Sequence, residues 1–347
     1  MKRTIKIMSA LLLMVSLAIP GVASAAPDSQ SYSSTPHNGI CSPVRMHVAL
    51  APQTAKRQYI SGTFCSPLKL GSVSSVDVLV HGFGYDRSYW DSAYQHPKYS
   101  YVSRTLQAGR AVFYYDRLGV GQSSRLTSDQ VTMDADAYVL HQVIQRYKSA
   151  FQIMDLIGHS YGSRISALET SRYNDATKLI LTGNLHAVGP AIASGELTSH
   201  PANQDPLFAG QHLDDGWTTA DSLASRNGFY DLATADPAEI AYDYAHRAIG
   251  SVTEFNGGRA IGAVPAGSNI TNSITRSVLL ISGQQDRLYC GLALDCNNLA
   301  NIKALETPYY TSAKSLTIKT VSDTGHDLAL HPSADESFSS INAWIRN

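Results

Sequence analysis

Short apolar segments rich in β-branched residues recur along the chain, and each leads into a polar or glycine-containing turn. They occupy residues 76–80, 111–115, 151–157, 179–182, 277–281 and 315–321. Segments with apolar residues at helical spacing lie between and after them, at residues 101–107, 133–147, 165–173 and 333–344. Strands that alternate with helices predict a mostly parallel sheet with helices on both faces. Ligands of such sheets bind beyond the carboxyl ends of the strands.

Two regions depart from this alternation. Residues 44–50 and 58–64 alternate apolar and polar side chains, which predicts an antiparallel pair of strands. Residues 186–276 show no clear strand and are too long for an ordinary loop. Their aromatic residues are Phe208, Trp217, Phe229, Tyr230, Tyr242, Tyr244 and Phe255. We expect a mainly helical cap here, inserted between the two parts of one core, residues 44–185 and 277–347.

The N-terminus has the pattern of a secretory signal. It contains basic residues, an apolar run and a small-residue stretch: Lys2, Arg3 and Lys6, then residues 10–19, then Ala23, Ser24 and Ala25. The alternative is an uncleaved anchor, but a spanning helix needs about 20 apolar residues. We therefore expect cleavage after Ala25, which removes residues 1–25 and leaves residues 26–43 as a loose lead-in. The mature protein is expected to be secreted or periplasmic, without a stable membrane anchor.

Composition narrows the class of protein further. The chain has 347 residues, of which 44% are hydrophobic and 16% are charged, and its formal net charge is −1. Such a chain buries a sizeable core and is not disordered. Its near-neutral net charge does not indicate a nucleic-acid-binding surface. The composition does not determine the oligomeric state.

Four cysteines lie beyond the expected signal, at Cys41, Cys65, Cys290 and Cys296. An even number in an exported protein suggests disulfides, and four cysteines allow three pairings. We favour Cys41–Cys65, which would tie the two N-terminal strands, and Cys290–Cys296, which would close a short loop. Free thiols and a zinc site are the alternatives, although the sequence lacks the C-x₂-C pairs of structural zinc sites.

The segment Gly158-His159-Ser160-Tyr161-Gly162 follows an apolar strand and precedes a helical stretch. This G-x-S-x-G pattern is typical of a nucleophile on a sharp strand-to-helix turn, where the flanking positions tolerate no bulk. The amino end of the following helix favours developing negative charge. Ordinary turns also carry the pattern by chance, but its place between strand and helix makes Ser160 the candidate nucleophile.

A serine hydroxyl needs a base to become a nucleophile. His326 lies just after the last expected strand, where it could take the Ser160 proton and return it to the leaving group. His331 and His159 are the rivals. The first lies further along the chain, and the second is adjacent to Ser160 on the turn, where neighbouring side chains point apart.

A catalytic triad also needs a carboxylate that orients the histidine. This residue should follow a strand that lies between the serine and the histidine in the chain. Asp286 comes after residues 277–281 and would hold the imidazole and stabilise its charged form. Asp295 is the rival, but it lies inside the loop between Cys290 and Cys296. The order serine, aspartate, histidine is that of the α/β-hydrolase arrangement.

An acyl-transfer site also needs N–H donors for the oxyanion. We expect one donor at Tyr161, directly after the nucleophile. The second is expected in the loop His81-Gly82-Phe83-Gly84, which follows an apolar strand. We assign it to the N–H of Phe83, with Gly84 as the alternative; without a catalytic role, His81-Gly82 is a strand-ending turn.

These segments together resemble the α/β-hydrolase-fold serine hydrolases, over most of residues 44–345. Four separated segments carry the resemblance: His81 to Gly84, Asp116-Arg117-Leu118-Gly119-Val120-Gly121-Gln122-Ser123, Gly158 to Gly162, and Asp286 with His326. The second resembles a structural turn of the family; a dinucleotide fingerprint is its rival, but the third glycine is missing. Within the family, the chain resembles a group of exported hydrolases in three features: Ser88-Tyr89-Trp90-Asp91, Tyr99-Ser100-Tyr101 and the paired cysteines.

The resemblance implies an α/β-hydrolase fold. No metal motif such as H-E-x-x-H appears in the sequence, and the expected serine mechanism needs no cofactor. The dehalogenase branch carries aspartate at the nucleophile position, so Ser160 favours esters, lactones or thioesters. We expect a serine hydrolase that cleaves carboxylic ester-type bonds of a fairly apolar small molecule. The alternatives are a peroxidase-type enzyme, a non-catalytic binding module, and an exopeptidase or amidase. A peptidase needs an acid in the cap, for which the candidates are Glu196, Asp214, Asp215 and Glu239.

Overall fold

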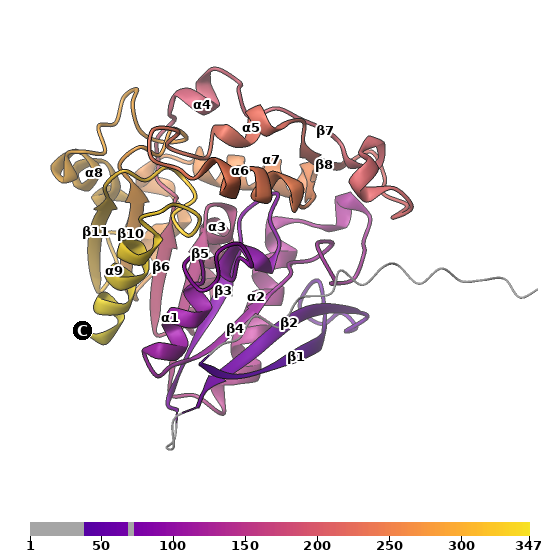
Figure 1. The fold of residues 1–347 in the computed structure, drawn as a ribbon. Coiled ribbons are helices and arrows are strands. Elements are labelled where there is room, and N and C mark those ends of the chain that lie inside the picture. The colour runs from indigo at the N-terminus through magenta and orange to yellow at the C-terminus, as the bar shows by residue number, and fades with distance from the viewer. Residues whose placement is uncertain (1–37, 69–72) are drawn as a thin grey trace, which may run out of the picture. The chain divides into compact units, whose positions relative to one another are not determined.

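The structure, a computed structural model, describes residues 38–68 and 73–347. The expected signal and most of the lead-in lie outside these residues. In the described part, an eight-stranded sheet has the order β1-β2-β4-β3-β5-β6-β10-β11 (Figure 1). Its strands are β1 Gly39–Val48, β2 Gln58–Pro67, β3 Ser75–Val80, β4 Ala111–Tyr115, β5 Ile153–His159, β6 Lys178–Thr182, β10 Ser277–Gly283 and β11 Ser315–Val321.

The sheet is mostly parallel, as the alternation of strands and helices predicts. All neighbours from β4 to β11 pair in parallel, whereas β1 and β2 pair antiparallel with each other and β2 pairs antiparallel with β4. β1 begins at Gly39, inside the expected lead-in, and pairs with β2 along its whole length, which places Cys41 opposite Cys65. Both favoured disulfides, Cys41–Cys65 and Cys290–Cys296, are present.

Alternation along each strand divides the core into two layers, one on each face of the sheet. In β3, Val78 packs in one layer and Leu79 in the other. Figure 1 shows the helices on both faces. The first layer includes residues of α2 (Met133–Lys148), α3 (Tyr161–Tyr173) and α8 (Leu299–Glu306), and the second includes residues of α1 (Tyr101–Gln107) and α9 (Ala334–Arg346).

Two helix assignments differ from the sequence pattern. α3 begins at Tyr161, four residues before its apolar spacing starts, because the turn at Ser160 leads straight into the helix. α8 was not expected, since Ile302 is its one fully buried apolar residue and a single position gives no periodicity.

Most of the segment 186–276 lies at the top of Figure 1, beyond the carboxyl ends of the parallel strands, whereas residues 270–276 pass the end of α3 and lead to the amino end of β10. Its helices are α4 Pro190–Ala193, α5 Leu223–Asn227, α6 Pro237–Ala245 and α7 Val252–Gly262, and its strands are β7 Ser199–Pro201, β8 Trp217–Ala220 and β9 Gly250–Ser251. The three strands pair antiparallel. They have two to four residues each, which is too short to give an alternating pattern.

Within residues 38–68 and 73–347, no helix has both the length and the apolar character that crossing a membrane requires.

Candidate active site

Ser160 lies on a sharp turn between β5 and α3 and is half-buried. Its backbone has a φ of 52° and a ψ of −113°, which residues with a side chain rarely adopt. A Cβ added to Gly158 would lie 2.4 Å from the Gly162 carbonyl oxygen. One added to Gly162 would lie 2.1 Å from the Val80 carbonyl oxygen. The turn therefore admits glycine alone at both flanking positions.

His326 and Asp286 form a buried pair at the ends of adjacent strands. Asp286 follows β10 and His326 follows β11, and their exposed fractions are 0% and 1%. Nδ1 of His326 lies 2.9 Å from Oδ2 of Asp286, and Oδ1 of Asp286 accepts the Leu288 N–H at 3.0 Å. In the described part of the chain, Nε2 of His326 is buried without a hydrogen-bond partner. The aspartate thus orients the ring and leaves Nε2 free for a proton.

The His326 ring lies beside the strand that neighbours Ser160. The Ser160 N–H donates to the Thr182 carbonyl at the end of β6. A Cβ added to the next residue, Gly183, would lie 3.1 Å from Cε1 of His326. Thr182 and Gly183, at the end of β6, therefore lie between the Ser160 turn and the His326 ring. Among the described residues, no hydrogen bond joins Oγ of Ser160 to Nε2 of His326.

The environment of His326 shifts its pKa upward. Burial alone would lower the pKa, because it disfavours the charged ring. The charge of Asp286 and its hydrogen bond outweigh burial and raise the pKa above the ordinary value of 6.5. The pair thus stabilises the imidazolium form that a general base passes through.

The two rival histidines have both ring nitrogens engaged. Nε2 of His331 accepts two backbone N–H groups, at 3.0 and 3.1 Å, and its Nδ1 lies 2.9 Å from the Asp327 carbonyl. His159 contacts Asp327 through Nε2 and Thr182 through Nδ1, both at 3.1 Å. The rival aspartate, Asp295, is exposed and accepts hydrogen bonds from Asn297. None of the three has the free, oriented position of the Asp286–His326 pair.

Hydrogen bonds to the Gly82 carbonyl orient the Gly82–Phe83 peptide. This carbonyl accepts from Nη2 of Arg117 at 3.2 Å and from Nδ1 of His81 at 2.9 Å. His81 donates through Nδ1 because its Nε2 already accepts the Arg117 N–H, and burial lowers its pKa well below 6.5, which keeps it neutral. A trans peptide points its N–H opposite to its C=O. The direction of the Phe83 N–H is therefore set by Arg117 and His81.

The cap segment holds the other side of the same loop. The Gly84 carbonyl accepts the Ala248 N–H and Nη2 of Arg226, both at 3.0 Å. Arg226 is buried and pairs with Asp243 at 2.9 Å. In the described residues, the backbone N–H groups of Phe83 and Tyr161 donate to no other protein group. Both are thus available to an oxyanion.

Arg117, Arg226 and Asp243 were not singled out from the sequence. Arg117 lies in the segment Asp116 to Ser123, which resembles a structural turn of the family. That resemblance is the sequence signal that could have pointed to Arg117. Arg226 and Asp243 belong to no recognisable motif, because their contacts depend on how the cap folds over the loop.

A buried chain of hydrogen bonds continues from the nucleophile turn into the cap. His159 contacts Asp327, which accepts the Tyr85 hydroxyl, and the same hydroxyl lies 3.2 Å from Asp243. Burial raises the pKa values of both Asp327 and Asp243. Tyr230 of the cap also donates to Asp243, at 2.8 Å. The residue after His326 is thereby linked to both the nucleophile turn and the cap.

Aromatic rings surround the candidate site. Phe229 and Tyr289 have ring centres 5.6 and 5.9 Å from that of His326. Phe255 lies 5.1 Å from Phe83 and stacks on Tyr161 at 5.6 Å. Of the cap aromatics noted in the sequence, Phe229 and Phe255 thus contact candidate site residues.

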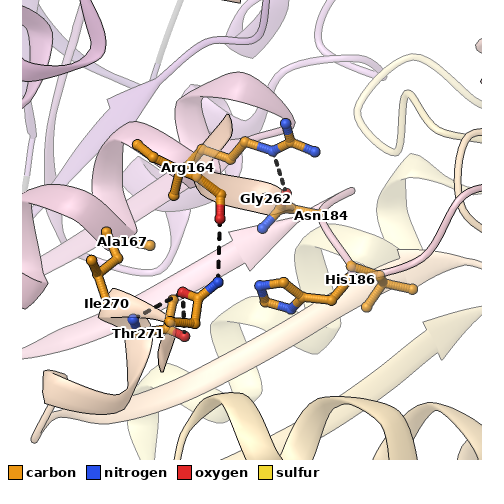
Figure 2. A pocket seen from close by; sticks show the side chains of 10 residues that line it. Arg164, Ala167, Asn184, His186, Gly262, Ile270 and Thr271 are labelled. Atoms are coloured by element: carbon orange, nitrogen blue, oxygen red, sulfur yellow. Dashed lines mark hydrogen bonds between the residues drawn. The ribbon is translucent and has the colours of Figure 1, made fainter. Parts of the chain in front are cut away.

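A small cavity lies beside the first turns of α3 (Figure 2). Its volume is about 20 Å³, which is room for about one water. Its lining residues are Arg164, Ala167, Asn184, Leu185, His186, Ile261, Gly262, Asn269, Ile270 and Thr271. Figure 2 shows Arg164 turned toward Asn184, to which its Nε donates at 3.1 Å. No candidate catalytic residue lines this cavity, so we do not assign it to the substrate.

Two groups of histidine and carboxylate side chains in the described residues have the spacing of metal ligands. One consists of His159, His326 and Asp327 and overlaps the candidate catalytic residues. The other consists of His141, Glu169 and Asp175 and includes no candidate catalytic residue.

The family model of the alpha/beta hydrolase family matches residues 78–336. The chain belongs to this family, and it is a hydrolase. Its fold is similar to that of a thermophilic esterase from Thermogutta terrifontis, with 16% identity, coverage of 88% of this chain and 98% of that chain, and a TM-score of 0.58. No curated protein matches the chain in sequence.

Two further solved structures share the fold at similarly low identity. A monoacylglycerol lipase from Paleococcus ferrophilus has 15% identity, coverage of 83% of this chain and 98% of that chain, and a TM-score of 0.52. An enol-lactonase from Burkholderia xenovorans has 16% identity, coverage of 84% and 97%, and a TM-score of 0.55. These likenesses show a shared fold, and the reaction has to be argued from the site.

Proposed function

We propose that this protein is a secreted serine hydrolase that cleaves carboxylic esters of fairly apolar small molecules through an acyl-enzyme on Ser160. The observation that carries the proposal is the free Nε2 of His326, oriented by Asp286 beside the strand that neighbours Ser160. A general base needs this arrangement of an oriented ring with one nitrogen open. The two disulfides support an oxidising, extracellular environment.

In the proposed reaction, Nε2 of His326 takes the hydroxyl proton while Oγ of Ser160 attacks the ester carbonyl carbon. The N–H groups of Phe83 and Tyr161 stabilise the oxyanion, and the amino end of α3 adds to that field. The intermediate collapses, the alcohol leaves with the proton from His326, and an acyl-enzyme remains. His326 then deprotonates a water molecule, whose oxygen attacks the acyl carbon. The bond from that carbon to Oγ of Ser160 breaks, His326 returns the proton to Oγ, and the acid is released.

Aromatic surroundings support the preference for apolar esters. Phe229 and Tyr289 flank the His326 ring, and Phe255 lies against Phe83 and Tyr161. These rings provide apolar surface where an acyl or alcohol group would approach.

The acids of the cap do not favour a peptidase that holds a substrate amine. Hydrogen bonds tie Glu196, Asp214 and Asp215 to Arg287, Ser128 and Asn203, respectively. Burial and neighbouring acids raise the pKa of Glu239 to about 9, so it is uncharged at neutral pH. Ester cleavage therefore remains the proposal, with lactones as the nearest variation of the same chemistry.

The test is hydrolysis of p-nitrophenyl esters by the mature protein and by Ser160→Ala. We expect the variant to lose at least about 10³-fold in kcat while its melting temperature stays near that of the wild type. A fluorophosphonate probe should label the wild type and not the variant. Ser171→Ala, at the far end of α3, is the matched control and should keep its activity. An unchanged rate in Ser160→Ala would refute the proposal, and a panel of lactones and amides would define the leaving group.

A further inference from the structure

We infer that His141, Glu169 and Asp175 bind a divalent transition-metal ion of the zinc class. His141 is on α2, Glu169 is near the end of α3, and Asp175 follows the last residues of α3. One ligand atom from each side chain lies within 4.8 Å of the other two. The site therefore joins two helices and the segment that leads into β6.

Each of the three side chains carries a buried polar atom without a hydrogen-bond partner among the described residues. Glu169 has an exposed fraction of 0%, and its Oε1 has no hydrogen-bond partner among the described residues. The same holds for Nδ1 of His141 and for Oδ1 of Asp175, which are also buried atoms. Buried polar atoms without partners are rare in native proteins and call for an occupant.

The distances suit a shared metal ion better than direct hydrogen bonds. Nδ1 of His141 lies 3.0 Å from Asp175 Oδ2 and 3.7 Å from Glu169 Oε1, yet it forms a hydrogen bond with neither. Ligand atoms of a tetrahedral zinc site are roughly 3.3 Å apart, given metal–ligand bonds of about 2.0–2.1 Å. The observed separations lie on either side of that value.

Charge also favours a cation at this position. Two carboxyl groups are buried together, and no lysine or arginine in the described residues forms an ion pair with either. Burial and the neighbouring Asp175 raise the pKa of Glu169 to about 10, so a proton is the competing occupant. A divalent ion would neutralise both carboxylates at once.

The chemistry of the ligands selects the class of ion. An imidazole nitrogen with two carboxylates suits zinc-class ions, whereas calcium and magnesium prefer oxygen ligands alone. The His141 ring stacks on Tyr173 with centres 3.8 Å apart, and Gln145 donates to Oδ2 of Asp175 at 2.5 Å. Such outer contacts orient metal ligands. The His141 side chain is 22% exposed, which leaves an approach for the ion.

The site is separate from the proposed reaction. Glu169 is nine residues along α3 from Ser160, which corresponds to about 13 Å of helix. An ion here would brace α2 against α3 without touching the ester. Metal binding should therefore change stability and leave the rate of ester hydrolysis unaltered.

The experiment is a calorimetric titration of the chelator-treated mature protein with zinc chloride. We expect one zinc ion per chain, with binding weakened at least about 10-fold in His141→Gln and in Glu169→Gln. The glutamine in Glu169→Gln resembles a protonated glutamate, so this variant should fold. His200→Gln is the matched control, because His200 also contacts two carboxylates, Asp205 and Asp221, and is 29% exposed.

Zinc should raise the melting temperature of the wild type and of His200→Gln, and not that of His141→Gln. The inference is wrong if the wild type binds no zinc, or if both site variants bind it as tightly as the wild type. Suppose that the wild type binds no zinc and that Glu169→Gln has the same melting temperature as the wild type. These two results together would show that the cluster holds a shared proton instead of a metal ion. Ester hydrolysis is measured separately, so failure of this site leaves the role of Ser160 untouched.

Discussion

Two glycines flank Ser160 in a space that leaves no room for a side chain. We expect Gly162→Ala to lower the free energy of unfolding by about 3 kcal/mol or more, because its Cβ would lie 2.1 Å from the Val80 carbonyl oxygen. Gly267→Ala is the control, since nothing lies within 4 Å of a Cβ there, and its change should stay within about 0.5 kcal/mol. Urea unfolding measures both. Equal stability of the two variants would contradict the tight packing of the turn.

The charge of Asp286 should be visible in the pH profile. His326 acts as a base only when neutral, so kcat/KM should fall as the pH drops through its pKa, which Asp286 holds above 6.5. Asp286→Asn removes the charge that raises this pKa, so the acidic limb should move to lower pH. The variant should also lose about 10³- to 10⁴-fold in kcat, because the tautomer of the ring is no longer fixed.

The measurement is kcat/KM between pH 5 and 9. Asp295→Asn, in an exposed turn, is the control and should reproduce the wild-type profile. If the acidic limb of the Asp286→Asn profile stays at the wild-type pH, that limb does not depend on the pairing of His326 with Asp286.

At the scale of elements, the loops that follow the parallel strands position the candidate catalytic residues. The loop after β10 turns back at Asp286, whose carbonyl accepts the Cys290 N–H at 2.7 Å, and the Cys290–Cys296 disulfide closes it. The Cys41–Cys65 disulfide instead links β1 and β2, at the opposite edge of the sheet from β10 and β11. The two disulfides should therefore differ in their effect on activity.

Replacing Cys290 and Cys296 together by serine should lower stability by about 2 kcal/mol and also reduce kcat, because the loop that orients Asp286 loosens. The matched variant replaces Cys41 and Cys65, and it should lose about 3 kcal/mol of stability while the folded protein keeps its kcat. Denaturant unfolding and steady-state rates at a temperature where both variants are folded separate the two effects. Equal kcat values in both variants would show that the loop closed by the Cys290–Cys296 disulfide does not affect catalysis.

At the scale of the whole described molecule, buried charge ties the cap segment to the core. Arg117 follows β4, is fully buried, and pairs with Glu254 of α7 and with Asp136 of α2, the latter at 3.3 Å. Burial and the neighbouring Glu254 raise the pKa of Asp136 to about 8. The same guanidinium orients the Gly82 carbonyl, so the cap and the oxyanion loop share one anchor.

Glu254→Ala should cost about 3–5 kcal/mol of stability, because it leaves a buried guanidinium with less compensation. It should also lower kcat, since the Gly82–Phe83 peptide loses part of its orientation. Arg172→Ala breaks an exposed pair with Asp134 and should cost less than about 1 kcal/mol. Thermal unfolding and ester hydrolysis test both, and a Glu254→Ala variant as stable as Arg172→Ala would contradict the anchoring role.

Local pattern sufficed for much of this protein. The strands from β3 to β11 of the main sheet were predicted to within about two residues at each end, because their apolar runs and turn residues are contiguous in the chain. The observed pairing of the cysteines was the favoured one of three, because two of them lie on neighbouring strands and two lie in a short loop. Ser160, Asp286 and His326 could be nominated because each directly follows a strand of a parallel sheet, whose carboxyl ends share one edge.

Tertiary structure alone decided which groups act on one another. The bond from Arg226 to the Gly84 carbonyl joins residues 142 positions apart, and no local pattern encodes such an approach. The same is true of the free Nε2 of His326 and of the meeting of His141, Glu169 and Asp175, where the sequence had indicated no metal. Hydrophobic periodicity records which face of an element is buried, whereas these contacts depend on how separate elements pack, and that is determined only when the whole core closes.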